Sequence, residues 1–348
     1  MVGLLLLGSS PEANLPMGED LERLKQRLPL LDYLRQQNWN GRPTGHAPEF
    51  VGFCPLHPET RPSFYVNADK NLFYCHGCGK GGDLIRLVQL SRRLSFRESL
   101  AFLEQQDAAR VTSAAALEET VAFYQRQLPR YPEALRYLEE RGLYDTALLL
   151  ELRLGYAPGG ILRRHLAAKG YSHDLLHHLG LVDARDRDAF FQRIVFPCCQ
   201  EGRLVNLYGR SLGPAFPHRF LPGSRGGLFA WKAVRIFSLA ILVEGLFDLA
   251  SLWQAGIRNT TCACGTHLTP TQLHQLSDSP NRWVYLAFDQ DRNQAGQHAA
   301  QALAHRLQRM GLVVARVRLP DGHDPNSYFR AGATPADCSR LIQEARSL

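Results

Sequence analysis

The chain has 348 residues, and its 45% hydrophobic and 21% charged residues are close to the average for globular proteins. This length suits two or three domains, and the formal net charge of +7 favours a polyanionic partner such as nucleic acid. No run of about 18 apolar residues occurs, which excludes a transmembrane helix, so no membrane partner is expected.

The first sixteen residues show neither a helical nor a strand pattern. Val2–Leu7 is apolar, but no basic residue precedes it, so a secretory signal is not indicated. After Met17, leucines recur at helical spacing and predict an amphipathic helix over residues 21–37. We therefore expect residues 1–16 to be a disordered tail or the product of a misassigned start, with the first domain beginning at residue 17.

Two short clusters of metal-binding side chains follow. Cys54 and His57 are separated by two residues, and so are Cys75 and Cys78. A gap of two residues lets one tight turn present both ligands, and Zn²⁺ takes four nitrogen or sulfur ligands in a tetrahedron. The sequence therefore predicts one structural zinc ion on these four side chains, as in a zinc ribbon, with His76 as a weaker alternative ligand.

The elements expected around these clusters are short. They are strands at 50–53, 63–66 and 72–74, helices at 84–90 and 95–105, and a linker over the Ala- and Ser-rich residues 106–116. The chain has eight cysteines, and the five outside the zinc clusters lack paired spacing. We expect these five to be buried thiols of a reduced, cytoplasmic protein.

The rest of the chain changes from a helical to an alternating pattern. Helices are expected at 117–128, 132–141, 144–151, 159–168 and 172–179, and residues 190–231 are strand-like. Further on, strands are expected at 236–243, 258–263, 283–288 and 312–318, helices at 246–255, 269–277 and 294–310, and a last helix at 335–347. Strands that alternate with helices at this spacing predict a parallel α/β sheet with helices on both faces.

Carboxylates follow the strands of this expected sheet. Glu244 comes after the first strand, with Asp248 in the first turn of the next helix, and Asp289 and Asp291 come after a later strand. The carboxyl ends of parallel strands form the ligand-binding edge of a sheet. Because clustered carboxylates suit Mg²⁺ or Mn²⁺, we expect a catalytic divalent cation here, with Asp324 as a further candidate.

The first region resembles the CHC-type zinc-binding domain of bacterial DnaG-type DNA primases. The resemblance rests on the segments Cys54-Pro-Leu-His-Pro-Glu-Thr-Arg-Pro-Ser-Phe64 and Phe73-Tyr-Cys-His-Gly-Cys-Gly-Lys-Gly-Gly-Asp83. In that family the ribbon binds single-stranded template. Arg61 and Lys80 are therefore expected to contact nucleic acid, while Tyr65 and Tyr74 belong either to the core or to a stacking surface.

The later region resembles the Toprim fold of the same primases. Val-Glu244-Gly, Asp289-x-Asp291 and Asp324-Pro occur in the expected order, and the strands near 193–210 are similar to the primase basic core. By this resemblance, Glu244, Asp289 and Asp291 are the catalytic metal ligands, assisted by Asp248 and Asp324 as ligands or supporting groups. The nucleic-acid contacts expected from the basic core are Arg193, Arg203, Arg210 and Arg219.

The expected fold class is α+β multidomain: a zinc ribbon, then a primase core with a mixed helical and strand subdomain and a Toprim α/β parallel sheet. The expected domains are a zinc-binding domain at 17–105, a linker at 106–116, the N-terminal part of the core at 117–235, Toprim at 236–330 and a C-terminal helix at 331–348. Asn326 departs from the family pattern, which often has a carboxylate there. Because little chain follows the sheet, a compact, mobile-element-like primase without the helicase-binding domain is expected.

The resemblance implies a DNA primase that makes short RNA primers on single-stranded DNA from ribonucleoside triphosphates. Divalent cations would hold the nucleotide phosphates and activate the attacking 3′-hydroxyl. Binding to a replicative helicase stays an open alternative, and the sequence does not define the surface that would bind it. Two other classes also stay open: a Toprim nuclease using the same carboxylates, and a noncatalytic replication adaptor that binds single-stranded DNA.

Overall fold

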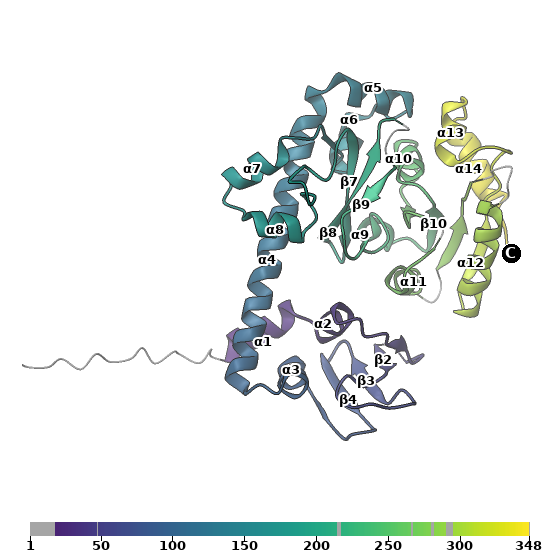
Figure 1. Ribbon diagram of the computed structural model, residues 1–348. Coiled ribbons are helices and arrows are strands. Elements are labelled where there is room, and N and C mark those ends of the chain that lie inside the picture. The colour runs from purple at the N-terminus through teal and green to yellow at the C-terminus, as the bar shows by residue number, and fades with distance from the viewer. Residues whose placement is uncertain are drawn as a thin grey trace, which may run out of the picture. The chain divides into compact units, whose positions relative to one another are not determined.

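The computed structural model describes residues 18–46, 48–213, 217–265, 267–279, 282–289 and 295–347. The chain divides into two compact units at Thr112, which we call unit 1 (residues 1–112) and unit 2 (residues 113–348) (Figure 1). The expected tail at 1–16 and the expected ligand Asp291 lie outside the described residues. Among the helices described, none is long and apolar enough to cross a membrane.

Unit 1 contains an antiparallel sheet of five strands in sequential order. The strands are β1 (Arg42–Pro43), β2 (Glu49–Gly52), β3 (Phe64–Asn67), β4 (Leu72–Cys75) and β5 (Gly81–Gly82). Side chains alternate along β3 and β4, so Phe64 and Phe73 are buried while Tyr65 and Tyr74 pair on the opposite face. The buried face packs against leucines of α2 (Leu30–Gln36) and α3 (Leu84–Arg92), which completes a small core.

The helix expected at 21–37 is in fact two helices, α1 (Gly18–Arg27) and α2. Pro29 separates them, because proline has no N–H to donate and its backbone here is extended, with φ −59° and ψ 136°. The first N–H of α2, on Leu30, donates instead to Asn71 Oδ1 at 2.6 Å. The break therefore ties the helix start to the loop between β3 and β4.

The linker expected at 106–116 is helical. It lies within α4 (Phe96–Gln127), a helix of 32 residues that replaces the two separate helices expected at 95–105 and 117–128. Alanine has the highest helix propensity, so a stretch rich in Ala continues a helix rather than ending it. At its start, Ser95 Oγ accepts the Glu98 N–H at 3.3 Å, and Glu98 Oε2 accepts the Ser95 N–H at 2.8 Å.

Unit 2 begins with the end of α4 and a helical region around an antiparallel sheet of four strands. The strands are β6 (Gly155–Ala157), β7 (Arg193–Gln200), β8 (Arg203–Ser211) and β9 (Arg219–Phe220). The helices are η1 (Leu128–Arg130), α5 (Pro132–Glu140), α6 (Thr146–Glu151), α7 (Leu162–Ala168) and α8 (His173–His178). The long β7–β8 hairpin forms the strand-rich segment that the Gly- and Arg-rich sequence predicted, with a register shift at Cys198 and Cys199.

The second sheet of unit 2 has the order β11-β10-β12-β13-β14. Its first four strands are parallel, as expected: β10 (Leu239–Val243), β11 (Thr260–Cys262), β12 (Trp283–Leu286) and β13 (Val313–Arg316). The helices are α9 (Trp231–Val234), α10 (Leu246–Gln254), α11 (Pro270–Leu276), α12 (Ala295–Arg309), α13 (Pro325–Arg330) and α14 (Pro335–Gln343). The parallel strands are mostly apolar and largely buried, which is typical of a sheet covered on both faces.

The C-terminal helix expected to reach residue 347 ends earlier. α14 stops at Gln343, and β14 (Arg346–Ser347) then pairs antiparallel with β13. The unexpected helix α13 starts at Pro325. Proline suits this position because the first N–H groups of a helix have no intrahelical partner, and proline has no N–H. Its N-cap is Asp324, whose carboxylate accepts the Ser327 N–H at 2.5 Å.

Candidate functional site

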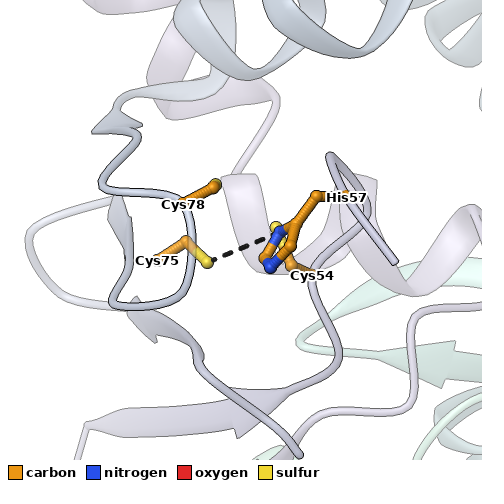
Figure 2. Close-up of side chains that lie close together, drawn as sticks. All are labelled: Cys54, His57, Cys75 and Cys78. Atoms are coloured by element: carbon orange, nitrogen blue, oxygen red, sulfur yellow. Dashed lines mark hydrogen bonds between the residues drawn. The ribbon is translucent and has the colours of Figure 1, made fainter. Parts of the chain in front are cut away.

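The predicted zinc ligands come together in unit 1. Figure 2 shows Cys54, His57, Cys75 and Cys78 converging from two turns, with their ligand atoms all within 4.8 Å of one another. His57 Nδ1 lies 3.9 Å from Cys75 Sγ, so Nδ1 is the nitrogen that faces the thiols. Three thiols and one imidazole nitrogen suit tetrahedral Zn²⁺, so these residues fit a structural zinc ion.

A carboxylate and a hydroxyl behind the ligands hold them in place. Glu59 Oε1 accepts the N–H of Cys54 at 2.7 Å and of Ser63 at 3.1 Å, while Glu59 Oε2 lies 3.3 Å from His57 Nε2. A carboxylate on the second nitrogen of a histidine fixes which nitrogen faces the metal. Ser63 Oγ lies 3.3 Å from Cys75 Sγ and accepts the Gly77 N–H at 3.1 Å. The sequence reasoning did not assign Glu59 and Ser63, although both lie within the stretch that carries the primase resemblance.

Gly77 is required because His57 and Ser63 pack closely against it. A Cβ at this position would lie 2.7 Å from Ser63 Oγ and 2.8 Å from His57 Nε2, which is closer than real Cβ contacts. Any larger residue would therefore displace the histidine or the serine. The turn that presents Cys75 and Cys78 depends on this glycine.

The thiols differ in how readily they ionise. Burial raises the pKa of Cys54 to about 12, and the neighbouring Cys75 and Cys78 add to the effect. Burial also opposes ionisation of Cys75, but hydrogen bonds, first among them the one with Ser63, outweigh it and lower the pKa of that thiol. A cation bound among the thiols would favour the thiolate form of all of them, because it supplies the compensating charge.

The face of the ribbon sheet opposite its core carries aromatic rings. His76 makes edge contacts with Tyr65 and Tyr74, at ring-centroid distances of 5.2 and 5.0 Å. Tyr74 is 48% exposed, and Arg61 and Lys80 are exposed as well. Phe64, by contrast, is fully buried and stacks on Phe73, so it belongs to the core. Exposed aromatic rings form the kind of surface on which unpaired bases stack, and exposed cations suit contacts with the phosphates.

In unit 2, two predicted carboxylates meet at the carboxyl edge of the parallel sheet. Glu244 follows β10 and Asp289 follows β12, and these strands are neighbours. The Asp289 N–H donates to Glu244 Oε1 at 3.2 Å. Both residues are half-buried. The sheet thus places two acidic side chains from distant parts of the sequence side by side, as the strand pattern predicted.

Asp248 lies beside this pair and is almost fully buried. Its Oδ2 accepts the Gly245 N–H at 3.0 Å, and its Oδ1 accepts the Asn326 N–H at 3.1 Å. Burial, and then the negative charges of Asp324 and Asp289, raise the pKa of Asp248 well above its ordinary value. These charges show that Asp248, Asp289 and Asp324 share one acidic region, and carboxylate oxygens of this kind fit Mg²⁺ or Mn²⁺.

Asn326, which stands where the family pattern often has a carboxylate, anchors the first turn of α13. Its side-chain nitrogen donates to the Arg141 carbonyl at 2.6 Å and to Ser251 Oγ at 2.7 Å. Asn326 is 2% exposed. An ionised carboxylate could make neither of these donations, so the amide fixes α13 against α10 and the segment after α5.

The arginines of the antiparallel sheet differ in accessibility. Arg203 and Arg219 are exposed, and Arg210 is half-buried, with its Nε 3.4 Å from the Tyr137 hydroxyl. Arg193 is only 5% exposed and donates from Nη1 to the Pro217 carbonyl at 2.7 Å. Its guanidinium faces the protein interior, so the expected phosphate contact is not supported for Arg193.

A basic depression beside β9 was not predicted in detail. Its volume is about 450 Å³, and its lining includes His218, Arg219, Arg225 and Cys264. The Arg225 guanidinium stacks over the Phe220 ring, 4.8 Å from its centroid. Cys264 follows β11, so the depression joins the antiparallel sheet to the carboxyl side of the parallel sheet. Arg225 lies in the stretch 190–231, for which the sequence predicted only strand-like structure.

Comparison with known proteins agrees with this arrangement. Three family descriptions match in chain order: a CHC2 zinc finger at residues 18–119, the N-terminal domain of the DNA primase catalytic core at 123–239, and a Toprim-like domain at 241–329. A DNA primase of Aquifex aeolicus is 30% identical over 340 residues, which cover 90% of this chain and 67% of the relative. The chain belongs to the DNA primase family.

In other DNA primases, the match with this chain covers a smaller share of the relative. A DNA primase of Staphylococcus aureus is also 30% identical, over 80% of this chain but only 53% of the relative, so the chain spans between half and two thirds of these proteins. Among solved structures, the zinc-binding and RNA polymerase domains of the Aquifex aeolicus primase match with a TM-score of 0.63 and 30% identity. That match covers 95% of this chain and 87% of the solved chain.

A DnaG primase catalytic domain solved with single-stranded DNA also matches. The TM-score is 0.56 at 27% identity, over 69% of this chain and 83% of that chain. The expected fold class is confirmed, because the zinc ribbon precedes a primase core with a Toprim-like sheet. The expected cofactors are confirmed as well: the CHC2 finger indicates structural zinc, and the Toprim-like domain indicates a catalytic divalent cation.

Proposed function

We propose that this chain synthesises short RNA primers on single-stranded DNA, as a template-directed RNA polymerase of the primase class. The observation that carries the proposal is the acidic edge of the parallel sheet. There Glu244 accepts the Asp289 N–H at 3.2 Å, and the charges of Asp324 and Asp289 act on Asp248. Phosphoryl-transfer sites concentrate carboxylates in this way to hold divalent cations.

Each acidic residue has a distinct proposed role. Glu244, Asp289 and Asp291 hold the divalent cations, which when bound neutralise phosphate charge and favour ionisation of the attacking 3′-hydroxyl. Asp248 positions the edge, because both of its oxygens already accept backbone N–H groups. Asp324, the N-cap of α13, has a supporting role, because its negative charge acts on Asp248.

Basic side chains provide a path for the template and the nucleotides. We assign phosphate contacts to Arg203, Arg210 and Arg219, and add Arg225 from the basic depression. Guanidinium groups suit this role because their planar fork donates two parallel hydrogen bonds to a phosphate. Arg193 is left out because its guanidinium is buried.

The zinc ribbon supplies a second surface that contacts DNA. The rings of Tyr65, Tyr74 and His76 offer stacking faces, with Arg61 and Lys80 as exposed cations. The substrates are ribonucleoside triphosphates, and the reaction takes place in the cytoplasm, where thiols such as those of this chain stay reduced.

The proposal is tested by incubating the full chain with single-stranded DNA, Mg²⁺ or Mn²⁺ and labelled ribonucleotides. New template-dependent RNA oligomers support it, and reactions without template or without metal serve as controls. Shortened DNA without RNA synthesis would instead identify a nuclease. Binding of DNA with neither reaction would identify a noncatalytic adaptor.

A further inference from the structure

A second group of metal-binding side chains lies in unit 2, away from the acidic edge in sequence. His173 and His177 lie one turn apart on α8, and Asp186 faces both. Asp186 Oδ1 is 2.8 Å from the Nε2 atom of each histidine, and the two Nε2 atoms are 3.2 Å apart. Three potential ligand atoms thus form a small triangle.

These side chains are held in place by local hydrogen bonds and by core packing. Ser172 caps α8 by accepting the Leu175 N–H at 3.3 Å, and Leu176 anchors the helix in the core between the two histidines. Asp186 sits in a turn that is closed by a hydrogen bond from the Asp183 N–H to the Arg187 carbonyl at 2.8 Å. Because the turn and the helix are both anchored, the triangle does not depend on a chance meeting of long side chains.

The turn itself is braced by a second carboxylate. Asp183 Oδ1 accepts the N–H groups of Arg185 and Arg187, at 2.8 and 3.0 Å, and Asp183 Oδ2 accepts the Arg187 guanidinium at 2.7 Å. Asp186 adopts the left-handed backbone conformation, with φ +58°. This conformation is unusual for residues other than glycine, and it aims the Asp186 carboxylate at the helix.

The distances match those of a metal coordination sphere. Zinc–nitrogen bonds of about 2.0–2.1 Å in a tetrahedron separate neighbouring ligand atoms by about 3.3 Å. The observed separations of 2.8, 2.8 and 3.2 Å are close to this value. Without a cation, two imidazole nitrogens converge on one carboxylate oxygen and on each other. A cation at the centre would accept a lone pair from all three atoms.

We propose that His173, His177 and Asp186 form a second metal site that binds a divalent first-row transition cation such as Zn²⁺. Two imidazoles and one carboxylate favour Zn²⁺, Co²⁺ or Ni²⁺ over Mg²⁺, which prefers oxygen ligands.

The site leaves room for a further ligand. The side chains of His173 and Asp186 are each 51% exposed, and that of His177 is 30% exposed, so one side of the triangle is open to solvent. Three protein ligands and an open fourth position are typical of zinc sites that bind water or an external ligand. The bound ion would also clamp α8 to the turn at 183–187 and stabilise unit 2.

The test is the zinc content of the full chain, measured after dialysis against a buffer of micromolar free zinc. The wild-type chain is expected to hold about two zinc ions, one in the ribbon and one at this site. Asp186→Asn keeps a residue that tolerates the left-handed backbone, and His177→Gln removes one ligand. Each variant is expected to hold about one ion and to bind the second at least about tenfold more weakly. Even substitution of residues that only hydrogen-bond to metal ligands lowers metal affinity about tenfold or more.

Two further variants complete the design. His178→Gln changes the neighbouring exposed histidine outside the triangle and is expected to keep both ions. Cys75→Ser is expected to keep only the ion of the second site. Melting of each variant in chelator, monitored by circular dichroism, checks that unit 2 stays folded. Wild-type protein with one zinc ion, or two ions retained in both Asp186→Asn and His177→Gln, would overturn the proposal.

Discussion

The two units of this chain build their metal sites in different ways. In unit 1, all four zinc ligands lie between residues 54 and 78, on two turns whose shape is local. In unit 2, Glu244 and Asp289 are 45 residues apart and meet only because β10 and β12 are neighbours in the sheet. A site built on turns can be recognised from spacing, whereas a site built on a sheet requires the topology.

The same difference should govern stability. The core of unit 1 is small and includes two of the zinc ligands, Cys54 and Cys75. Unit 2 has an extensive apolar core around the parallel sheet, and its acidic edge adds charge repulsion rather than stability. We therefore expect unit 1 to need its metal in order to fold, and unit 2 to fold without any metal.

The largest predicted effect is on the zinc ribbon. Cys75→Ser should lose the ribbon zinc and unfold unit 1, because structural zinc contributes about 10 kcal/mol or more of binding free energy to folding. The measurement is zinc content together with the thermal transitions of both units. Cys199→Ser, at a half-buried thiol outside the site, is the control and should keep the zinc. Retention of ribbon zinc by Cys75→Ser would reject this ligand set.

A smaller effect is predicted for Asn326→Asp, which would remove the side-chain hydrogen bonds that fix α13 and would leave the zinc ligands unchanged. The new carboxylate would face the Arg141 carbonyl, which can only accept, and would lie close to Asp248. We expect a loss of about 2–3 kcal/mol in the free energy of unfolding, measured by urea denaturation of unit 2. Gln343→Glu adds the same charge at an exposed position and should be nearly neutral. An equal result for both variants would show that the Asn326 amide does not matter.

The arginines of unit 2 should affect DNA binding rather than folding. Replacing Arg203 and Arg219 together by alanine should weaken single-stranded DNA binding for different sequences alike. The slope of the logarithm of affinity against that of salt concentration should fall by about 0.7 for each lost phosphate contact. Arg340→Ala, on the exposed side of α14, is the matched control. An unchanged salt slope in the double variant would place the DNA elsewhere.

The smallest predicted effect concerns the stability of unit 1. Asp83 caps α3 by accepting the Arg86 N–H at 3.0 Å and pairs with Lys25 at 2.9 Å. Burial opposes the charge of Asp83, but the Arg86 N–H and Lys25 outweigh it and lower its pKa. Asp83→Ala should therefore cost about 1 kcal/mol of unfolding free energy at neutral pH.

The pH dependence of this loss has a defined sign. Because the pKa of Asp83 is lower in the folded chain than its unfolded value of about 3.9, its contribution is complete above that value. The contribution is lost as the pH falls through the folded pKa. Urea denaturation at several pH values should show the difference between wild type and Asp83→Ala shrinking in acid. A difference that stays constant or grows in acid would contradict the role of the charge.

The sequence identified what depends on local spacing or on strand ends. The zinc ligands and the pair Glu244 and Asp289 were predicted for these reasons, and the four parallel strands were found close to their expected positions. The break at Pro29 and the continuous helix α4 were missed. Proline outweighed a regular leucine pattern, and alanine propensity outweighed a composition typical of linkers.

Features set by tertiary contacts could not be predicted. β14 exists only because Arg346 and Ser347 reach the edge of β13, a pairing that no local pattern indicates. The burial of Arg193 depends on the Pro217 carbonyl, 24 residues away. The His173 and His177 pair was overlooked because Asp186 completes the triangle only through the left-handed turn.

We infer that the acidic edge of unit 2 performs the chemistry while other surfaces bind the template. The most direct test measures primer synthesis and single-stranded DNA binding side by side for wild type, Glu244→Gln and Asp289→Ala. We predict that both variants lose primer synthesis and keep near wild-type DNA binding, because neither residue contributes positive charge or a stacking ring. Primer synthesis at near wild-type rates in both variants would contradict the account.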